Sequence, residues 1–358
     1  MSASPNAAVR PPGPSVCVIP TVCVIIVAFN AGRYLAACIE SLRRQSWTDF
    51  EAIIVDNGST DGSVAGLDSL PPSFHILAAG KNLGFAAANN RGAAATQAPW
   101  IALLNPDAIA APDWLERLMA AARDHPGIVM FGSTQIQLAD ETRWDGLGDV
   151  YHASGILWRG GFDQGVAGPA PGGEVFSPCA AAALYRRDEF LGVGGFDERF
   201  FCYTEDIDLA FRLRLRGQRA LQVADAVVRH AGSATTGRGS DFTLFHGWRN
   251  RSWVFIKNMP GPLFWPLLPL HLAALALLLL LALRPGSRER FAPCWRGLTA
   301  AVAGLGPIWR SRQEIQRQRR ASLGAIVRAM SWSPAALLAR RPVLKPICDA
   351  GAKPEARP

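Results

Sequence analysis

The sequence predicts an α/β fold, with a mixed, mostly parallel sheet between flanking helices and a hydrophobic, basic helical region at the C-terminus. Short apolar runs rich in β-branched residues alternate with helical patterns up to about residue 230, as in parallel sheets buried on both faces. Several runs end at Asn or Asp, where open α/β sheets bind ligands. Beyond residue 262 the chain becomes leucine-rich and then basic.

Composition limits the class of protein. With 358 residues and 49% hydrophobic content, the chain is long enough for one large domain or two ordinary ones and is not a disordered protein. Residues 284–358 hold 15 Lys and Arg against 4 Asp and Glu, a net charge of +11, whereas residues 1–283 carry −3. Because a hydrophobic run precedes this basic tail, we expect an anionic membrane surface as its partner, rather than nucleic acid.

Four regions are predicted: a flexible lead over residues 1–20, a main α/β domain over 21–246, an interfacial and hydrophobic segment over 247–283, and a basic helical tail over 284–358. Pro20 interrupts the apolar run that begins at Val16, so we predict no cleaved signal peptide. The seven cysteines include no CxxC pair and are interpreted as buried thiols in a reducing compartment.

The first strand, helix and second strand are predicted at 21–29, 34–45 and 50–55. Together they make a βαβ unit, which is parallel and right-handed. Asn30 and Asp56 follow the two strands, so Asp56 is placed to hydrogen-bond a ligand. The Asp-Asn-Gly sequence that it begins also suits a simple turn, and both interpretations remain open.

Asp107 follows the next buried strand, predicted at 100–104, within Asn105-Pro106-Asp107. Pro106 fixes the backbone so that the Asp107 side chain projects at the strand end. A carboxylate there could bind Mg²⁺ or Mn²⁺ that also touches a diphosphate. The alternative is a turn that leads into a helix at 112–123. The other predicted elements are a strand at 74–78, a helix at 86–96, a strand at 180–185, a helical turn at 186–191 and a last strand at 221–229.

His230 follows the last predicted strand. It could give a nitrogen ligand to the same cation, although a lone histidine is more often structural. Residues 128–173 are Gly-rich with weak periodicity, and we expect strands with long loops that line one side of a cleft.

Three acids, Glu205, Asp206 and Asp208, begin a helix predicted to end near Gly217. Thr204 is the expected N-cap, and the acids lie at the positive end of the helix dipole. Asp206 in the first turn could accept a proton from a hydroxyl group held in a cleft. The alternative is that the acids only stabilise the start of a surface helix.

The C-terminal third carries the membrane hypothesis. Residues 247–260 mix aromatic and basic residues suited to a headgroup layer, and Leu263–Leu283 is apolar. Pro266 and Pro269 leave 14 uninterrupted residues, which favours an interfacial segment or a hairpin over a single crossing. The second arm of a hairpin would be 297–308. From Ile308 onward, an amphipathic pattern indicates either a helix on anionic lipid or a buried helix of a small subdomain.

Several motifs occur together in one order: VAFN, VDNGSTDGS, NLGFAAANNRG, LLNPD, GGFDERFFCYTEDIDLAFRLRLRG and RHAGS. They resemble glycosyltransferase family 2, the inverting enzymes of the GT-A fold, and within it the rhamnosyltransferase-like branch. The resemblance covers about Thr21 to Pro260.

The resemblance implies a role for each matching residue. Asp206 would be the catalytic base, Asp107 and His230 would hold a divalent cation, and Glu205 and Asp208 would support the base. Asn105 replaces the first carboxylate of the family's DxD motif. The donor nucleotide would be bound by Ala28, Phe29, Asn30, Asp56, Asn82, Arg91 and Asn105.

The implied function is a membrane-associated glycosyltransferase on the cytoplasmic face of the bacterial inner membrane. It would move one sugar, with rhamnose from dTDP-rhamnose as the first candidate, to a glycan or lipid-linked acceptor of a surface polysaccharide. The QxxRW-type motif of processive family members is absent after Asp208. The alternatives are a nucleotidyltransferase, which would need a more basic Gly-rich loop than VAFNAGRY, and a non-catalytic membrane scaffold.

Overall fold

The computed structural model describes residues 19–347 except 68, 233–236 and 238, so nearly all of the predicted N-terminal lead and the last 11 residues lie outside it. The elements, in chain order, are β1 (Val22–Ala28), α1 (Arg33–Arg43), β2 (Phe50–Asp56), β3 (Phe74–Ala78), α2 (Gly84–Ala95), β4 (Trp100–Leu104), β5 (Ala108–Ala110), α3 (Trp114–Asp124), β6 (Met130–Gln137), β7 (Trp144–Gly146), β8 (Asp149–Tyr151), β9 (Leu157–Arg159), β10 (Gly173–Val175), β11 (Ala182–Arg186), α4 (Arg187–Gly192), the 3₁₀ helix η1 (Glu198–Phe200), α5 (Glu205–Leu215), β12 (Ala220–His230), α6 (Asp241–Asn258), α7 (Gly261–Ala282), the 3₁₀ helix η2 (Arg288–Arg290), α8 (Phe291–Ala303), α9 (Leu305–Arg317), α10 (Leu323–Ala329) and α11 (Pro334–Ala339).

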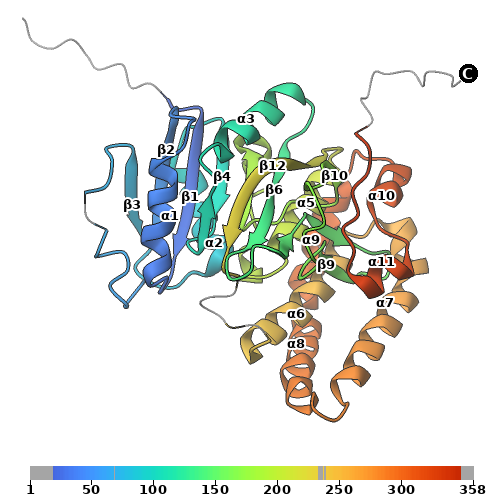
Figure 1. The fold of residues 1–358 in the computed structure, drawn as a ribbon. Coiled ribbons are helices and arrows are strands. Elements are labelled where there is room, and N and C mark those ends of the chain that lie inside the picture. The colour runs from blue at the N-terminus through green and yellow to red at the C-terminus, as the bar shows by residue number, and fades with distance from the viewer. Residues whose placement is uncertain (1–18, 68, 233–236, 238, 348–358) are drawn as a thin grey trace, which may run out of the picture.

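A mixed sheet forms the centre of the molecule (Figure 1), in the order β10-β12-β6-β11-β4-β1-β2-β3. Four of the seven pairs along this order are parallel, and the antiparallel ones involve β10 and β11. Strand β5 pairs with β12, β7 pairs with β6, and β8 and β9 form a separate ribbon. The βαβ unit predicted at the N-terminus is therefore present, with β1 and β2 in parallel register.

Strand β1 explains why the sheet has helices on both faces. All seven of its residues are buried, and alternate residues face opposite sides of a strand. Val22, Val24 and Ile26 join an apolar cluster with α1 and α3. The intervening residues join a second cluster with α2, α4 and α5. The continuous apolar run in the sequence thus reports burial on two faces.

The C-terminal helices gather at the β10 side of the sheet, away from β3 (Figure 1). Ile308, Ile326 and Met330 are at most 2% exposed and pack in a cluster with Trp253 and Phe264. The amphipathic pattern that begins at Ile308 therefore belongs to buried helices of a C-terminal helical region, divided between α9 and α10. The structure therefore does not contain the alternative, a single amphipathic helix whose apolar face lies on lipid.

Helix α6 also differs from the expectation. Residues 247–260 were expected in a headgroup layer, yet Trp248 and Trp253 are 6% and 7% exposed. Helix α8 covers α6 closely, since a Cβ added at Gly297 would lie 2.5 Å from the carbonyl oxygen of Phe245. Helix α8 thus occupies part of the predicted second hairpin arm, and it packs against protein.

Helix α7 runs for 22 residues without a break, with Pro266 and Pro269 inside it. The prediction that these prolines interrupt the helix is wrong, because each removes one backbone hydrogen bond and the flanking apolar turns continue the helix. Among the described residues, α7 is the one helix long and apolar enough to cross a membrane by length and composition, and 17% of its apolar window is buried.

Candidate functional site

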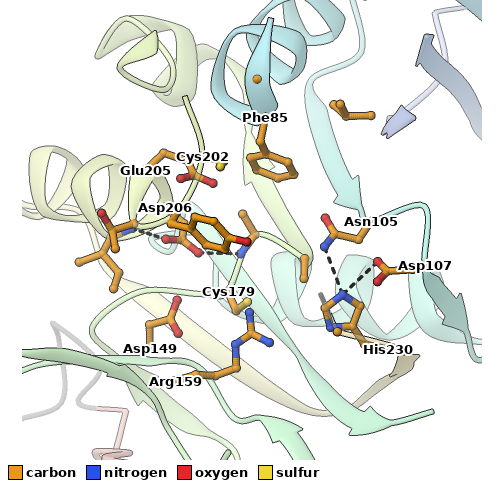
Figure 2. A pocket seen from close by; sticks show the side chains of 18 of the residues that line it. Phe85, Asn105, Asp107, Asp149, Arg159, Cys179, Cys202, Glu205, Asp206 and His230 are labelled. Atoms are coloured by element: carbon orange, nitrogen blue, oxygen red, sulfur yellow. Dashed lines mark hydrogen bonds and ion pairs between the residues drawn. The ribbon is translucent and has the colours of Figure 1, made fainter. Parts of the chain in front are cut away.

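A cavity of about 780 Å³ opens at the carboxyl ends of β1 and β4 and continues to the start of α5. Figure 2 shows it from close by. Its walls come from segments far apart in sequence: Val27, Phe29, Asn57, Asn82, Gly84, Phe85, 105–107, Asp145, Asp149, 157–159, Phe162, 179–181, 201–207, His230, Gly232 and Phe242.

Asp206, the second residue of α5, lies on one side of this cavity. Its Oδ1 accepts a hydrogen bond from the Ile207 amide at 2.8 Å, and its Oδ2 accepts one from the Ala180 amide at 3.2 Å. Burial raises the pKa of Asp206, although the two amides and the Arg159 guanidinium oppose the shift. A fixed carboxylate with a raised pKa is a stronger base than an exposed one.

The segment that leads into α5 is strained. Phe201, Tyr203 and Thr204 have φ values of 65°, 69° and 66°, a region that non-glycine residues rarely adopt. Thr204 is the N-cap residue of α5 by position, as predicted, but its side chain makes no capping hydrogen bond. Its backbone is left-handed, whereas a capping residue has an extended backbone.

Asn250 of α6 holds this strained segment in place. It is fully buried, and its Nδ2 donates to the carbonyl oxygens of Phe200, Cys202 and Tyr203 at 2.8 to 3.0 Å. Strain of this kind persists only where the surroundings fix it, and it clusters at functional sites. Helix α6 therefore sets the position of the wall that carries Asp206.

The two acids beside Asp206 have different surroundings. Glu205 lines the cavity and is 6% exposed. Burial, and then the charge of Asp206, raise the pKa of Glu205 well above its ordinary value. Asp208 is fully buried away from the cavity, where its carboxylate accepts hydrogen bonds from Arg212, Lys257 and Asn258.

A second polar group lies on the other side of the cavity (Figure 2). His230 ends β12, and its Nε2 lies 3.2 Å from Asp107 Oδ1 and 3.2 Å from Asn105 Nδ2. Its Nδ1 lies 2.7 Å from Asp145 Oδ2. Burial lowers the pKa of His230, but the bonds to Asp107 and Asp145 outweigh it and raise the pKa to about 9.

This second group fits a divalent cation. Asp107 and Asn105 offer oxygen and His230 offers nitrogen, a set that suits Mn²⁺ or Mg²⁺. The buried Oδ1 of Asn105 has no hydrogen-bond partner among the described residues. Asp145 stands behind the histidine, the arrangement in which a carboxylate fixes the ring for a metal.

The predicted nucleotide-binding residues are divided. Phe29, Asn82 and Asn105 line the cavity, whereas Ala28, Asn30, Asp56 and Arg91 do not. Asp56 is half-buried at the end of β2, and its Oδ1 accepts from the Ser59 amide at 2.9 Å, as a turn former does. Asn30 Oδ1 accepts from the Thr60 amide at 2.8 Å, and Arg91 is exposed on α2.

Several residues that line the cavity were not predicted from the sequence. Asn57 is buried and joins the loop after β2 to Asn82. Asp145, Asp149 and Arg159 come from the Gly-rich region that was expected to line one side of the cleft, but no single residue was predicted there. A possible signal was the presence of charged residues beside aromatic ones in short apolar stretches.

A third cluster of ligand atoms brings Asp149, Cys179 and Asp206 within 4.8 Å of one another. Burial, and then the charge of Asp206, raise the pKa of Asp149 well above its ordinary value. The Arg159 guanidinium, which donates to Asp145 at 2.6 Å, lines the same cavity. This cluster includes Asp206 and lies on the other side of the cavity from His230 (Figure 2).

Comparison with known proteins identifies the class of this protein. A family model, Glycosyl transferase family 2, matches residues 23–191. An N-acetylglucosaminyl-diphospho-decaprenol L-rhamnosyltransferase of Mycobacterium tuberculosis is 31% identical over 249 residues, which are 60% of this chain and 77% of that protein. The chain belongs to glycosyltransferase family 2 and is of the rhamnosyltransferase type, so the predicted family and enzyme class are confirmed.

Other comparisons agree. A PGL/p-HBAD biosynthesis glycosyltransferase of Mycobacterium bovis is 28% identical over 186 residues, covering 51% of this chain and 65% of that protein. The structure of GalNAc-T7 with UDP, GalNAc and Mn²⁺ matches with a TM-score of 0.53 and 15% identity, over 67% of this chain and 48% of that one. Residues 1–349 of S. aureus TarS match with a TM-score of 0.51 and 13% identity, over 83% and 88%. The predicted fold class is confirmed.

Proposed function

We propose that this glycosyltransferase moves one sugar from a nucleoside diphosphate donor to a glycan or lipid-linked acceptor with inversion at the anomeric carbon. The observation that supports this most is the shared cavity: Asp206 lies on one side, and the Asn105, Asp107 and His230 group lies on the other. An in-line displacement needs such separation, because the hydroxyl attacks one face of the sugar while the diphosphate leaves the opposite face.

Asp206 acts as the general base. The acceptor hydroxyl gives its proton to the carboxylate as its oxygen bonds to C1, and the bond from C1 to the diphosphate breaks. The amides of Ile207 and Ala180 orient the carboxylate. General-base help of this kind contributes about 10² to 10⁴ in rate.

Asp107, His230 and Asn105 hold a divalent cation in this proposal. When bound, the cation neutralises charge on the departing diphosphate. Asp145 keeps the His230 ring oriented through the 2.7 Å contact at Nδ1. The Mn²⁺ in the GalNAc-T7 structure supports a cation without identifying the ion used here.

The donor nucleotide binds against the cavity wall that Phe29, Asn57 and Asn82 form, next to the β2 end that carries Asp56. The acceptor faces Trp158 and Tyr203, whose rings suit stacking against a sugar. The rhamnosyltransferase relative supports dTDP-rhamnose as the first donor to test. The diphospho-decaprenol acceptor named for that relative also supports a lipid-linked diphosphate acceptor, and synthesis of a bacterial surface polysaccharide as the process.

The enzyme associates with the cytoplasmic face of the inner membrane through α7. Leu272, Leu277 and Leu280 are 56 to 63% exposed on this helix. Several exposed leucines on one helix form an apolar patch, which indicates an interaction surface more strongly than a single exposed leucine does. Arg284, Arg288 and Arg290 are exposed just beyond its end, where they complement anionic headgroups. We propose monotopic insertion over a single crossing, with residues 21–246 as the catalytic part and the basic tail on the same side.

The test is turnover of a panel of nucleotide sugars with Mg²⁺ or Mn²⁺ and a lipid-linked acceptor extract. We expect the wild type to use one donor with inversion, and Asp206→Asn to lose about 10²-fold or more. Asp188→Asn, at an exposed carboxylate on α4, is the matched control and keeps full activity. Equal turnover by Asp206→Asn would contradict the proposed base.

A further inference from the structure

A second carboxyl group lies against Asp206. Asp149 begins β8, a segment remote from α5 in sequence, and both side chains line the cavity (Figure 2). The ligand atoms of Asp149 and Asp206 lie within 4.8 Å of each other and of Cys179 Sγ. Asp149 is 5% exposed, so its charge is screened less than that of a surface carboxylate.

The backbone keeps the two carboxyl groups together. The Asp149 amide donates to the Ser177 carbonyl oxygen at 2.8 Å. The Ser177 hydroxyl donates to the Asp206 carbonyl oxygen at 3.2 Å, and the Ala180 amide donates to Asp206 Oδ2. Strand β8, the segment 177–180 and the start of α5 therefore form one hydrogen-bonded unit, and the spacing is part of the fold.

The charges around Asp149 and Asp206 do not favour ionisation of both carboxyl groups. Among the described residues that line the cavity, Arg159 is the one Arg or Lys, and it is bound to Asp145 at 2.6 Å. The titratable groups that interact electrostatically with Asp149 or Asp206 are Asp145 on β7, Arg159 on β9, Cys179, Tyr185 on β11 and Glu205 on α5. Two buried carboxyl groups this close do not both ionise at low cost, so the protonated form of one of them is favoured.

We propose that Asp149 keeps a proton and donates it in a hydrogen bond to the Asp206 carboxylate, which makes Asp149 a positioning residue for the base. This inference rests on the proposed function of Asp206. In the reaction, the acceptor proton moves to Asp206 and the electron pair of the broken C1–O bond leaves with the diphosphate, while Asp149 retains its own proton throughout. The bond to Asp149 also opposes the effect of burial on the pKa of Asp206.

A cation at Asp149, Cys179 and Asp206 is the competing explanation of the same geometry. Both oxygens of Asp206 already accept backbone hydrogen bonds. Burial raises the pKa of Cys179 to about 12, so the thiol is protonated at neutral pH, and metals bind the thiolate. The Arg159 guanidinium also lies close enough for its charge to act on the pair.

Infrared spectroscopy of the full chain tests the proton without any substrate. At pH 7 we expect the wild type to show a protonated-carboxyl C=O band that Asp149→Asn loses, while Asp188→Asn keeps it. Glu205→Gln separates the contribution of Glu205 from that of the pair. An unchanged band in Asp149→Asn, or a stoichiometric cation bound by the wild type and lost in this variant but retained by Asp107→Asn, overturns the proposal.

The pH dependence of kcat/KM tests the role of that proton. Asp149→Asn keeps a hydrogen-bond donor, so its acid limb stays within about 0.3 pH units of the wild type. Asp149→Val removes the donor, and its acid limb moves up by roughly one pH unit, giving about a tenfold loss at pH values below that limb. A move to lower pH in both variants means that Asp149 is ionised, and an equal loss at all pH values means that its role is only structural; either result overturns the proposal.

A failure of the proposed function, or of a variant to fold, can be distinguished from a failure of the inference about Asp149. If the wild type uses no donor, the proposed function fails while the infrared result still reports on the pair. If Asp149→Val does not fold, the isosteric Asn variant and its spectrum still test the proposal.

Discussion

Glu205 is buried beside Asp206, and its carboxyl group makes the stability of the fold depend on pH. The folded state holds the Glu205 proton more tightly than the unfolded state, because the pKa of Glu205 is raised on folding. The free energy of unfolding therefore falls as pH rises above the ordinary glutamate value of about 4.3. This loss continues until the pH passes the raised pKa of the folded state.

We predict that Glu205→Gln removes this loss. The melting temperature of the variant minus that of the wild type should rise between pH 5 and pH 8, by about 2 °C or more. Glu40→Gln, on the exposed face of α1, is the control and should show no such trend. Thermal unfolding followed by circular dichroism measures the difference, and a constant difference across this range would contradict the assignment of a raised pKa to Glu205.

The site residues that could be predicted from the sequence are those that lie within a recognisable motif. Asp107, Asp206 and His230 were named, and the structure places all three around one cavity. Asp149 and Arg159 were not named, because their short strands carry no periodicity and their role depends on contacts between distant segments. Their partners are visible only after the chain has folded.

At the scale of elements, the segment between η1 and α5 depends on close contact with α2. Gly84 begins α2 with φ of 81°, and a Cβ there would lie 2.6 Å from the ring and carbonyl oxygen of Phe201. The same carbonyl oxygen accepts from the Ala86 amide at 3.1 Å. Any side chain at position 84 would displace the segment that leads to Asp206.

We predict that Gly84→Ala lowers both stability and turnover. Gly80→Ala is the matched control, because Gly80 also has a positive φ, 78°, but no atom lies within 4 Å of an added Cβ. Both variants should lose about 1 to 2 kcal/mol from backbone strain, and Gly84→Ala should lose at least about 1 kcal/mol more from overpacking. Equal losses in urea unfolding, with equal activity, would show that the contact with Phe201 is unimportant.

Elements were predictable where a mainly apolar run extends over at least five residues. Strands β3 and β4 have the predicted bounds, because each is a mainly apolar run that turn residues follow. Strands β5 and β7 to β10 have three residues each, too few for a period-2 pattern to appear. Thr204 provides no side-chain cap for a tertiary reason, since Asn250 helps to hold the preceding loop in a conformation that local propensity does not favour.

At the scale of the whole molecule, the apolar face of α7 is the surface that our proposal assigns to lipid. We predict that Leu277→Glu with Leu280→Glu reduces binding to vesicles of anionic lipid by tenfold or more, because each charge must enter the apolar layer. Vesicle flotation measures this, and Leu191→Glu, exposed on α4, is the control. Unchanged flotation of the double variant would exclude α7 as the membrane contact.

The C-terminal region also shows the limit of prediction at this scale. Its composition favoured lipid for residues 247–283 and left the pattern from Ile308 open between lipid and a buried helix, because composition does not distinguish lipid from the protein's own core. Ile308 and Ile326 face Trp253 and Phe264, whereas Leu277 and Leu280 are exposed. Only the packing of α6 to α10 separates the two environments.

The two sides of the cavity have different tasks in the proposed reaction. Asp107 and His230 hold the cation, and Asp206 accepts the proton. The most direct test is Mn²⁺ binding to the full chain, measured by electron paramagnetic resonance in the presence of the nucleoside diphosphate that the donor panel identifies. We predict that Asp206→Asn binds Mn²⁺ within about twofold of the wild type while losing turnover, and that Asp107→Asn weakens Mn²⁺ binding by at least about tenfold. Loss of Mn²⁺ in Asp206→Asn with normal binding in Asp107→Asn would contradict the account and place the cation beside Asp149 and Cys179.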